Sequence, residues 1–170
     1  SLIHKGPQLR AAAQAAFVRA AEIAHAADRL VALTLSDSFC VERHRLAFQD
    51  LVKGHVDILF ANEAEITALF QTDFDTAAEW VGKHCAMAAL TRGEKGAVVI
   101  SGSFVAEVAA SPVEEVIDTT GAGDLFAAGF LHGVSRGLPI EEAGRLGAIA
   151  SAEIISHYGA RPAVKLSDLL

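Results

Sequence analysis

Hydrophobic residues in the first part of the chain recur at helical spacing in some stretches and as short continuous runs in others. Residues 9–27 carry apolar side chains three and four positions apart, which predicts an amphipathic helix. Short apolar runs predict buried strands at residues 30–35, 56–60 and 87–91. The segments between these runs predict helices at residues 42–53, 62–70 and 75–84. Since strands and helices alternate, we expect βαβ units and a parallel sheet with helices on both faces.

The second part of the chain begins with a hairpin pattern and ends with two helical segments. Residues 96–100 and 104–108 flank a Ser-Gly-Ser turn, which predicts an antiparallel hairpin. A further short run, residues 113–117, predicts the end of another strand. Helices are predicted after the glycine turn at residue 121, and again from residue 140 to about residue 157. We therefore expect one α/β domain over residues 1–170, in three α/β/α layers, with a mostly parallel sheet.

Composition and charge narrow the class of protein. The chain has 170 residues, of which 52% are hydrophobic, and this suits a globular domain with a real core. Its net charge of −7 argues against a nucleic-acid partner, which would need clustered Lys and Arg. No apolar run reaches membrane-spanning length and no signal peptide pattern is present. Cys40 and Cys85 lack metal-ligand spacing, so we expect reduced thiols in a cytoplasmic protein with no membrane partner.

Residues 116–133 are the most informative stretch, because a strand end, a small-residue turn and a helix follow one another there. The turn Gly121-Ala122-Gly123 lets a ligand approach the backbone closely. The first amides of the following helix lack partners within it, so with the helix dipole they form an anion site. Asp124 suits a base that takes a proton from a hydroxyl beside a transferring phosphoryl group. The alternative is a plain tight turn with an acidic residue that favours the helix dipole.

Asn62 and Glu65 open a predicted helix directly after a predicted strand. Asn followed three residues later by Glu is typical of a capping box, which needs no ligand. The same residues also lie at the carboxyl end of a parallel strand, where ligands bind in open α/β sheets. Glu65 could there hold Mg²⁺ through water, since this ion prefers few carboxylates plus substrate phosphates. Both interpretations are compatible with the sequence.

Two further segments carry polar residues at predicted strand ends. Thr91, Gly93 and Gly96 follow one strand, and by themselves they indicate either a polar turn or a place for close approach to a ligand. Asp118 precedes the glycine turn, and its simplest role is that of a turn former that caps nearby amides.

Asp118-Thr119-Thr120-Gly121-Ala122-Gly123-Asp124, followed by Phe126-Ala127-Ala128-Gly129-Phe130, resembles the C-terminal signature of the ribokinase-like (PfkB) carbohydrate and nucleoside kinases. The resemblance implies a Rossmann-like, ribokinase-like fold, ATP and Mg²⁺ as cofactors, and a sugar or nucleoside as acceptor. Asp124 would be the catalytic base, with the amides of Gly121, Ala122 and Gly123 as the anion hole. The other implied roles are nucleotide contacts at Asn62, Thr91, Gly93, Gly96 and Gly123, Mg²⁺ near Glu65, and a monovalent cation such as K⁺ at Asp118 with residues 154–163.

The resemblance extends from about residue 9 to the end and corresponds to the C-terminal half of such a kinase. The N-terminal strands, the sugar-contacting residues and the β lid have no counterpart in this chain. Within the family, residues 36–42 and 156–162 are similar to bacterial adenosine kinases.

The sequence therefore predicts an ATP-dependent phosphotransferase that acts on a primary hydroxyl of a sugar or ribonucleoside. Dinucleotide binding is disfavoured because Phe126 stands where a third glycine would be needed. An ordinary P-loop is excluded because its Gly-Lys-Ser/Thr pattern does not occur. The remaining alternative is a truncated, catalytically incompetent nucleotide-binding or interaction module. An open sheet edge would then favour homo-oligomers. The absence of an initial Met leaves open whether the chain belongs to a longer protein.

Overall fold

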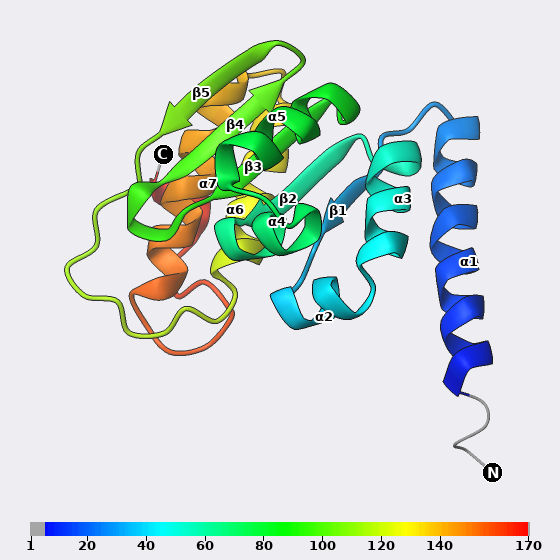
Figure 1. Ribbon diagram of the computed structural model, residues 1–170. Coiled ribbons are helices and arrows are strands. Elements are labelled where there is room, and N and C mark those ends of the chain that lie inside the picture. The colour runs from blue at the N-terminus through cyan, green and yellow to red at the C-terminus, as the bar shows by residue number, and fades with distance from the viewer. Residues whose placement is uncertain (1–5, 170) are drawn as a thin grey trace.

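The computed structural model describes residues 6–169, with side chains from residue 12 onward. A five-stranded sheet runs through its middle in the order β1-β2-β3-β4-β5 (Figure 1). Strands β1 (Ala32–Thr34), β2 (Ile58–Asn62) and β3 (Met87–Thr91) pair in parallel. Strands β4 (Ala97–Ser101) and β5 (Phe104–Val108) complete it as an antiparallel hairpin. The expected α/β fold with a mostly parallel first part and a C-terminal hairpin is confirmed.

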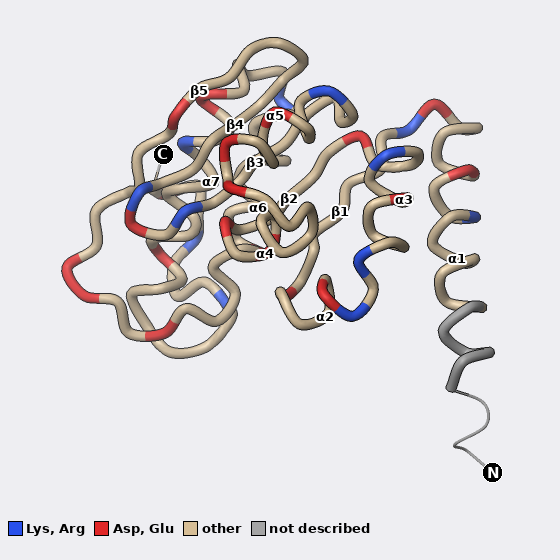
Figure 2. The backbone as a smooth tube through the Cα atoms, viewed as in Figure 1, with Lys and Arg blue, Asp and Glu red and all other residues tan. Residues whose placement is uncertain are grey.

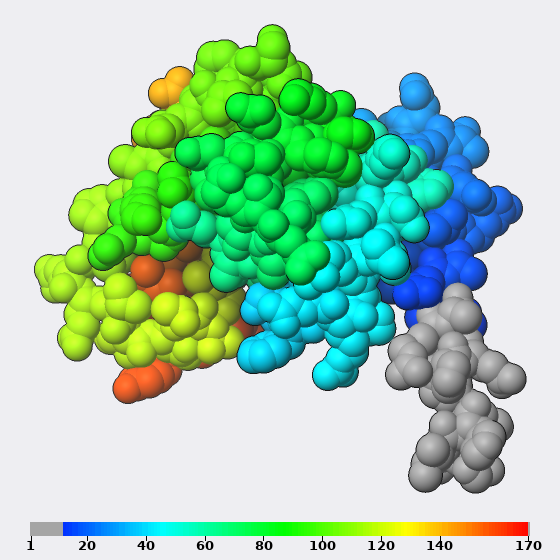
Figure 3. All heavy atoms as spheres, in the orientation of Figure 1, coloured from blue at the N-terminus to red at the C-terminus, as the bar shows by residue number. Residues whose placement is uncertain are grey.

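Helices lie on both faces of the sheet, as the alternation of elements predicted. One face packs against α2 (Ser38–Arg43), α3 (Arg45–His55), α4 (Glu63–Phe70) and α5 (Phe74–His84). The opposite face packs against α6 (Ala122–Ser135) and α7 (Ile140–Ile155) (Figure 1). Helix α1 (Gly6–Ala26) lies outside α3 at one side of the molecule (Figure 3), and the short 3₁₀ turns η2 (Gly93–Lys95) and η3 (Leu166–Leu169) complete the described elements.

Alternating side chains along the strands build the two separate cores. In β2, Leu59 and Ala61 point into the core under α4 and α5, whereas Ile58 and Phe60 point into the core under α6 and α7. Successive strand residues face opposite sides of a sheet, so both faces must be apolar when both are covered. Phe60 meets Phe130 of α6 edge to face, with 5.5 Å between ring centroids. This contact seats α6 on the sheet and so helps to fix the glycine turn that precedes it.

The structure corrects three of the predicted elements. Residues 113–117 form no strand: Ile117 donates its amide to the carbonyl of Ile155 at the end of α7. Two glutamates and the preceding proline break up that apolar run, and Val116 is 55% exposed. The helix predicted over residues 42–53 is two helices separated at His44. The first begins earlier than predicted, where Asp37 caps it by accepting the Cys40 amide at 2.7 Å. The first strand is shorter than residues 30–35, since Leu30 is exposed.

Charged side chains are distributed over many elements. Lys and Arg lie on helices, turns and loops spread over the described part of the chain, among a larger number of Asp and Glu (Figure 2). None of the helices within residues 6–169 has both the length and the apolar character needed to cross a lipid bilayer. The predicted helix start at residues 9–11 and the first five residues lie outside the described side chains.

Candidate active site

The carboxyl ends of the parallel strands meet at one edge of the sheet and open into a cleft. Asn62 of β2 and Thr91 of β3 are register partners, so the two predicted segments are direct neighbours. The space between these strand ends and the start of α6, which we call the central cleft, has a volume of about 580 Å³. Its lining residues are Thr34, Ser36, Phe60, Ala61, Asn62, Glu65, Ala89, Thr91, Gly93, Thr119, Gly121, Ala122, Gly123, Asp124 and Phe126.

The glycine turn presents unpaired backbone amides to this cleft. Gly121 caps α6 in the left-handed conformation with φ of 84°, which favours glycine. The Leu125 amide donates to the Gly121 carbonyl at 2.9 Å, whereas the amides of Gly123 and Asp124 donate to no backbone carbonyl of residues 6–169. A Cβ at Gly123 would meet no atom within 4 Å, so the cleft side of the turn is open. The turn can therefore bind an anion directly through its backbone.

Asp124 lies beside these free amides in the first turn of α6. Its side chain is exposed and lines the central cleft. A carboxylate in this place can accept a proton from a hydroxyl that enters the cleft. The neighbouring N–H groups can at the same time bind the negative charge of an anion. The structure thus brings Asp124, Gly121, Ala122 and Gly123 into one cleft wall. The Ala122 amide donates to the Thr119 carbonyl at 3.1 Å, so it is not among the free amides.

Asn62 and Glu65 form the predicted capping box at the opposite wall. The Asn62 side chain accepts the Glu65 amide at 2.8 Å. Glu65 in turn accepts hydrogen bonds from the Asn62 backbone amide and the Asn62 side-chain amide, each at 2.9 Å. Glu65 is 6% exposed, and burial raises its pKa, with the nearby charge of Asp37 acting in the same direction. Burying the charge of Glu65 costs free energy. A hydrated cation bound at this wall of the cleft would offset that cost.

The segment after β3 contributes the third wall. Gly93 has φ of 58° and open space around its missing Cβ, so a ligand can approach its backbone. Gly96, with φ of 86°, instead packs directly against the Val108 carbonyl of β5. Gly96 and Ser111 line a second, adjoining cleft of about 180 Å³. Ser151 and other residues of α7 form the rest of its lining. The two clefts share Thr91, Gly93, Thr119, Ala122, Gly123 and Phe126.

An ion pair ties this third wall to the capping box. Arg92 donates to Glu63 at 3.0 Å, and its guanidinium lies 4.1 Å from the centroid of the Phe74 ring. Both side chains are only partly shielded from solvent, with 25% of Arg92 and 37% of Glu63 exposed. The pair fixes the loop of Gly93 relative to the start of α4. Sequence reasoning missed it, because Glu63 begins α4 whereas Arg92 follows β3, far away in the chain.

Asp118 lies behind the glycine turn and does not line the central cleft. Its Oδ1 accepts the Thr120 amide at 2.9 Å, and its Oδ2 accepts the Gly159 amide at 3.1 Å. These hydrogen bonds, first those from Thr120, hold the pKa of Asp118 below its usual range. Asp118 therefore contacts the loop expected from the sequence, but both oxygens already bind N–H donors. Its assignment to a monovalent cation stays a prediction.

Some cleft residues carry no sequence motif. Thr34 and Ser36 line the central cleft after the first parallel strand, and Ser36 has φ of 73°, which is uncommon for a residue other than glycine. The available signal was their place at the carboxyl end of a parallel strand, where side chains face the ligand crevice. Among the described residues, no group of three or more His, Cys, Asp or Glu side chains could hold a metal ion. A metal in this cleft would therefore depend on bound substrate oxygens.

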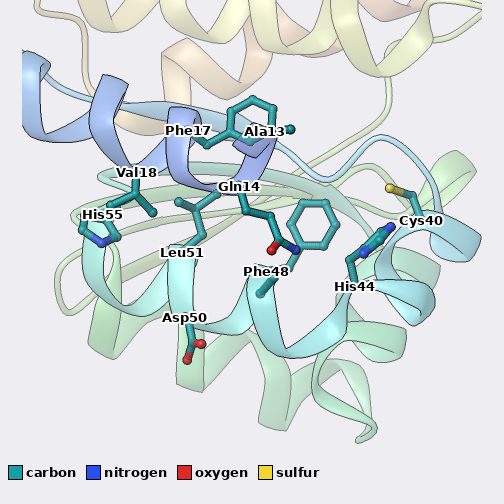
Figure 4. Close-up of a pocket in the computed structure, with 11 residues that line it drawn as sticks. Ala13, Gln14, Phe17, Val18, Cys40, His44, Phe48, Asp50, Leu51 and His55 are labelled. Atoms are coloured by element: carbon teal, nitrogen blue, oxygen red, sulfur yellow. The ribbon is translucent and has the colours of Figure 1, made fainter. Parts of the chain in front are cut away.

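A separate cavity of about 400 Å³ lies between α1 and α3 (Figure 4). Phe17 and Val18 from α1, with Phe48 and Leu51 from α3, give it a mainly apolar lining. None of the predicted site residues lines this cavity. It is therefore a packing gap beside the outer helix rather than part of the candidate active site.

The family of the chain follows from comparison with known proteins. Residues 8–166 match the model of the pfkB family carbohydrate kinases. The chain belongs to this family. A cytidine kinase of Thermococcus kodakarensis is 41% identical over 112 residues, which are 64% of this chain and 40% of the relative. An uncharacterized sugar kinase of Archaeoglobus fulgidus is 43% identical over 118 residues, which are 68% of this chain and 46% of the relative.

Solved structures of pfkB relatives share the fold of this chain. The adenosine kinase of Sinorhizobium meliloti is 50% identical, with a TM-score of 0.86 over 90% of this chain and 47% of its own. A probable sugar kinase from Rhizobium etli is 46% identical, with a TM-score of 0.87 and the same coverage. These structures confirm the resemblance to ribokinase-like kinases and, within that family, to bacterial adenosine kinases. The chain spans less than half the length of these relatives.

Proposed function

We propose that the chain is the catalytic part of an ATP-dependent phosphotransferase that acts on a primary hydroxyl of a sugar or ribonucleoside. The observation that carries the proposal is the exposed Asp124 carboxylate beside the free amides of Gly123 and Asp124. A base and an anion hole in one cleft wall are the parts that phosphoryl transfer to an alcohol requires. Relatives named cytidine kinase and adenosine kinase support a nucleoside acceptor, and others named sugar kinase support a sugar.

Each wall of the central cleft has a role in this proposal. Asp124 takes the proton from the acceptor hydroxyl as the hydroxyl oxygen attacks the γ-phosphorus of ATP. The bond between the γ-phosphorus and the β,γ-bridging oxygen breaks, and ADP leaves. The backbone amides of Gly123 and Asp124, which donate to no backbone carbonyl of residues 6–169, bind the charge on the phosphoryl oxygens. Thr91 and Gly93 contact the nucleotide phosphates and ribose, and the adjoining cleft of Gly96 and Ser151 receives the rest of the nucleotide. Asn62 and Glu65 complete the phosphate side of the cleft.

Glu65 is the residue that would hold Mg²⁺ in this cleft, through water. When bound, the ion would neutralise phosphate charge. Glu65 fits this role because its buried carboxylate lines the central cleft, where a cation would offset the cost of burying its charge. No step is assigned to K⁺, because Asp118 does not line the central cleft. The two free cysteines support a reducing compartment, and we place the reaction in the cytoplasm.

The decisive test is Asp124→Asn in the complete gene product, assayed with ATP, Mg²⁺ and a panel of nucleosides and sugars. We expect kcat to fall by roughly 10²–10⁴, the range for loss of a general base. The affinity for ATP should change little, because Asn keeps the size of the side chain. Glu142→Gln on exposed α7 surface serves as the control. A kcat near the wild-type value in the Asp124 variant would disprove the assignment.

The Mg²⁺ role is tested separately by Glu65→Gln. Gln also fits a capping box, so the helix start should be preserved. If Glu65 organises the ion, half-maximal rate will require more Mg²⁺ in the variant than in the wild type. An identical Mg²⁺ titration would leave Glu65 with its capping role alone.

A truncated nucleotide-binding module is the second candidate function. Binding of ATP without transfer to any acceptor, measured with the complete gene product, would favour it over the kinase.

A further inference from the structure

Glu153, near the end of α7, is a buried carboxylate outside the central cleft. Its side chain is 8% exposed. Oε1 accepts three hydrogen bonds, from the Ala163 amide at 2.7 Å, the Val164 amide at 3.2 Å and His157 Nε2 at 3.1 Å. All three donors belong to residues 157–164, the segment that follows α7, which we call the C-terminal loop. Glu153 therefore fixes this loop at both of its ends.

His157 provides the side-chain contact in this arrangement. Its Nδ1 faces the Tyr158 carbonyl at 3.2 Å and its Nε2 faces Glu153, so both ring nitrogens meet oxygen acceptors. These contacts, together with the charge of Asp118, raise the pKa of His157. The His157 ring of the loop and the Glu153 carboxylate of α7 are thus joined by a hydrogen bond.

The C-terminal loop in turn contacts the glycine turn from behind. The Gly159 amide donates to Asp118, whose other oxygen accepts the Thr120 amide. A Cβ placed on Gly121 would lie 3.2 Å from the Ala160 Cβ. Asp118 and Gly121 belong to the turn that supplies the free amides of the candidate active site. A continuous series of contacts therefore leads from Glu153 to the anion-binding amides.

Burying the Glu153 carboxylate near the end of α7 costs free energy of folding. Its Oε2 is buried and, within the part of the chain that the structure describes, has no hydrogen-bond partner. A buried charge with an unsatisfied oxygen is unfavourable, and a well-packed apolar side chain of similar volume is often neutral or better. The carboxylate is therefore explained by the geometry it imposes on the loop rather than by stability.

We propose that Glu153 is a positioning residue that holds the glycine turn in its anion-binding geometry through the C-terminal loop. The proposal rests on the proposed phosphotransferase function. Glu153 touches neither cleft, so it contributes no atom to the reaction. It acts by keeping the Gly159 amide on Asp118 and the Ala160 side chain against Gly121. The amides of Gly123 and Asp124 are then directed into the central cleft before a substrate arrives.

The test compares Glu153→Leu, which removes all three hydrogen bonds, with Glu153→Gln, whose amide oxygen can still accept the Ala163 and Val164 amides. Glu142→Gln on the same helix is the control, because Glu142 pairs with Arg145 at the surface. We expect Glu153→Leu to lower kcat by roughly 10- to 100-fold, the scale of a misplacement of about 1 Å. The KM for the acceptor and the melting temperature should change little. Glu153→Gln should recover part of the rate.

Hydrogen exchange of the unliganded variants provides a readout that does not depend on activity. Glu153→Leu should speed exchange in residues 157–164 and also in residues 119–124. Faster exchange in the loop alone, or an unchanged kcat despite a loosened loop, would overturn the proposal. A wild-type protein without transfer activity would contradict the proposed function instead, and exchange in residues 119–124 would still decide whether Glu153 positions the turn.

Discussion

The two cysteines of this protein differ in how deeply their side chains are buried. Cys85 follows α5, is 5% exposed and lies 4.0 Å from the Val52 carbonyl. Burial raises the pKa of its thiol to about 11. Cys40 lies in α2 with part of its surface open to solvent.

We therefore expect iodoacetamide at pH 8 to modify Cys40 and to leave Cys85 unmodified in the folded chain. The thiolate is the reactive form, and a buried thiol with a raised pKa provides very little of it. Peptide mass spectrometry after labelling identifies the site. In urea both cysteines should react, which is the positive control. Equal labelling of the two in the native protein would contradict the described burial of Cys85.

Glu65 gives a pH dependence whose sign follows from its raised pKa. The folded protein holds this proton more tightly than the unfolded chain, where the pKa is near its usual value of 4.5. The stability from this group is therefore fully present below pH 4.5 and is lost as the pH rises through the raised value. Since Gln does not titrate, urea unfolding from pH 4 to 8 should favour Glu65→Gln over wild type increasingly as the pH rises. Parallel pH curves would show that burial of Glu65 has no such effect.

The sequence predicted well the geometry that depends on residues close together in the chain. Asn62 and Glu65 are three positions apart, and Gly121 to Asp124 are consecutive, so turn and cap chemistry alone indicates their geometry. Glu153 and the pair of Arg92 with Glu63 were not predicted as parts of the site. Their partners come from other elements, and only the folded chain shows which donors reach them.

At the scale of elements, α6 and α7 form the closest helix pair of the structure, because glycines replace side chains between them. A Cβ at Gly129 would lie 2.5 Å from the Leu146 carbonyl oxygen, and one at Gly133 would lie 2.7 Å from the Ala143 Cβ. Small residues let helix backbones approach, and here the approach fixes the position of the glycine turn at the start of α6.

We expect Gly129→Ala to destabilise the chain by about 1–3 kcal/mol, the usual cost of overpacking a well-packed contact. Gly54→Ala in α3 is the matched control, since a Cβ there meets nothing within 4 Å. This control should gain up to about 1 kcal/mol, because Ala loses less backbone entropy in a helix than Gly. Urea titrations with equal m-values would measure both. A Gly129 variant as stable as the Gly54 variant would contradict the close packing.

Helices and strands were predicted well where apolar positions recur regularly along the whole element. They were predicted poorly where polar residues interrupt that pattern. The hairpin of β4 and β5 and helix α5 match their predicted ranges closely. The predicted strand at residues 113–117 fails because its apolar residues are separated by Glu114 and Glu115 and find α7 instead of a sheet edge. The early start of α2 arises from the Asp37 cap, which the apolar pattern does not indicate.

The sheet has two edge strands, β1 and β5, and neither has a second partner among the described strands. Strand β1 pairs only with β2 among the described strands, and large apolar side chains nearby face solvent, such as Phe39 at 79% and Leu46 at 75% exposure. An open edge with exposed apolar groups favours association.

For the 170-residue chain by itself, we predict weak ATP binding, no transfer to adenosine or ribose, and concentration-dependent association. Transfer requires both reactants to be positioned in a closed, dry site, and the chain covers less than half of the related kinases. Light scattering after size exclusion and a labelled-ATP assay measure the two properties. The double variant Phe39→Glu with Leu46→Glu should reduce association. Robust product formation by a monomeric chain would show that the site needs nothing beyond these residues.

The order of strands in the sheet equals their order in the chain, and this has a consequence for synthesis on the ribosome. All five strands have been made once Val108 has emerged, and each can pair at once with the strand before it. The helices that cover Phe60 and Val99 are made later, as α6 and α7. A nascent chain stalled near Pro112 would therefore expose a broad apolar sheet face, and such an intermediate is a natural client for chaperones.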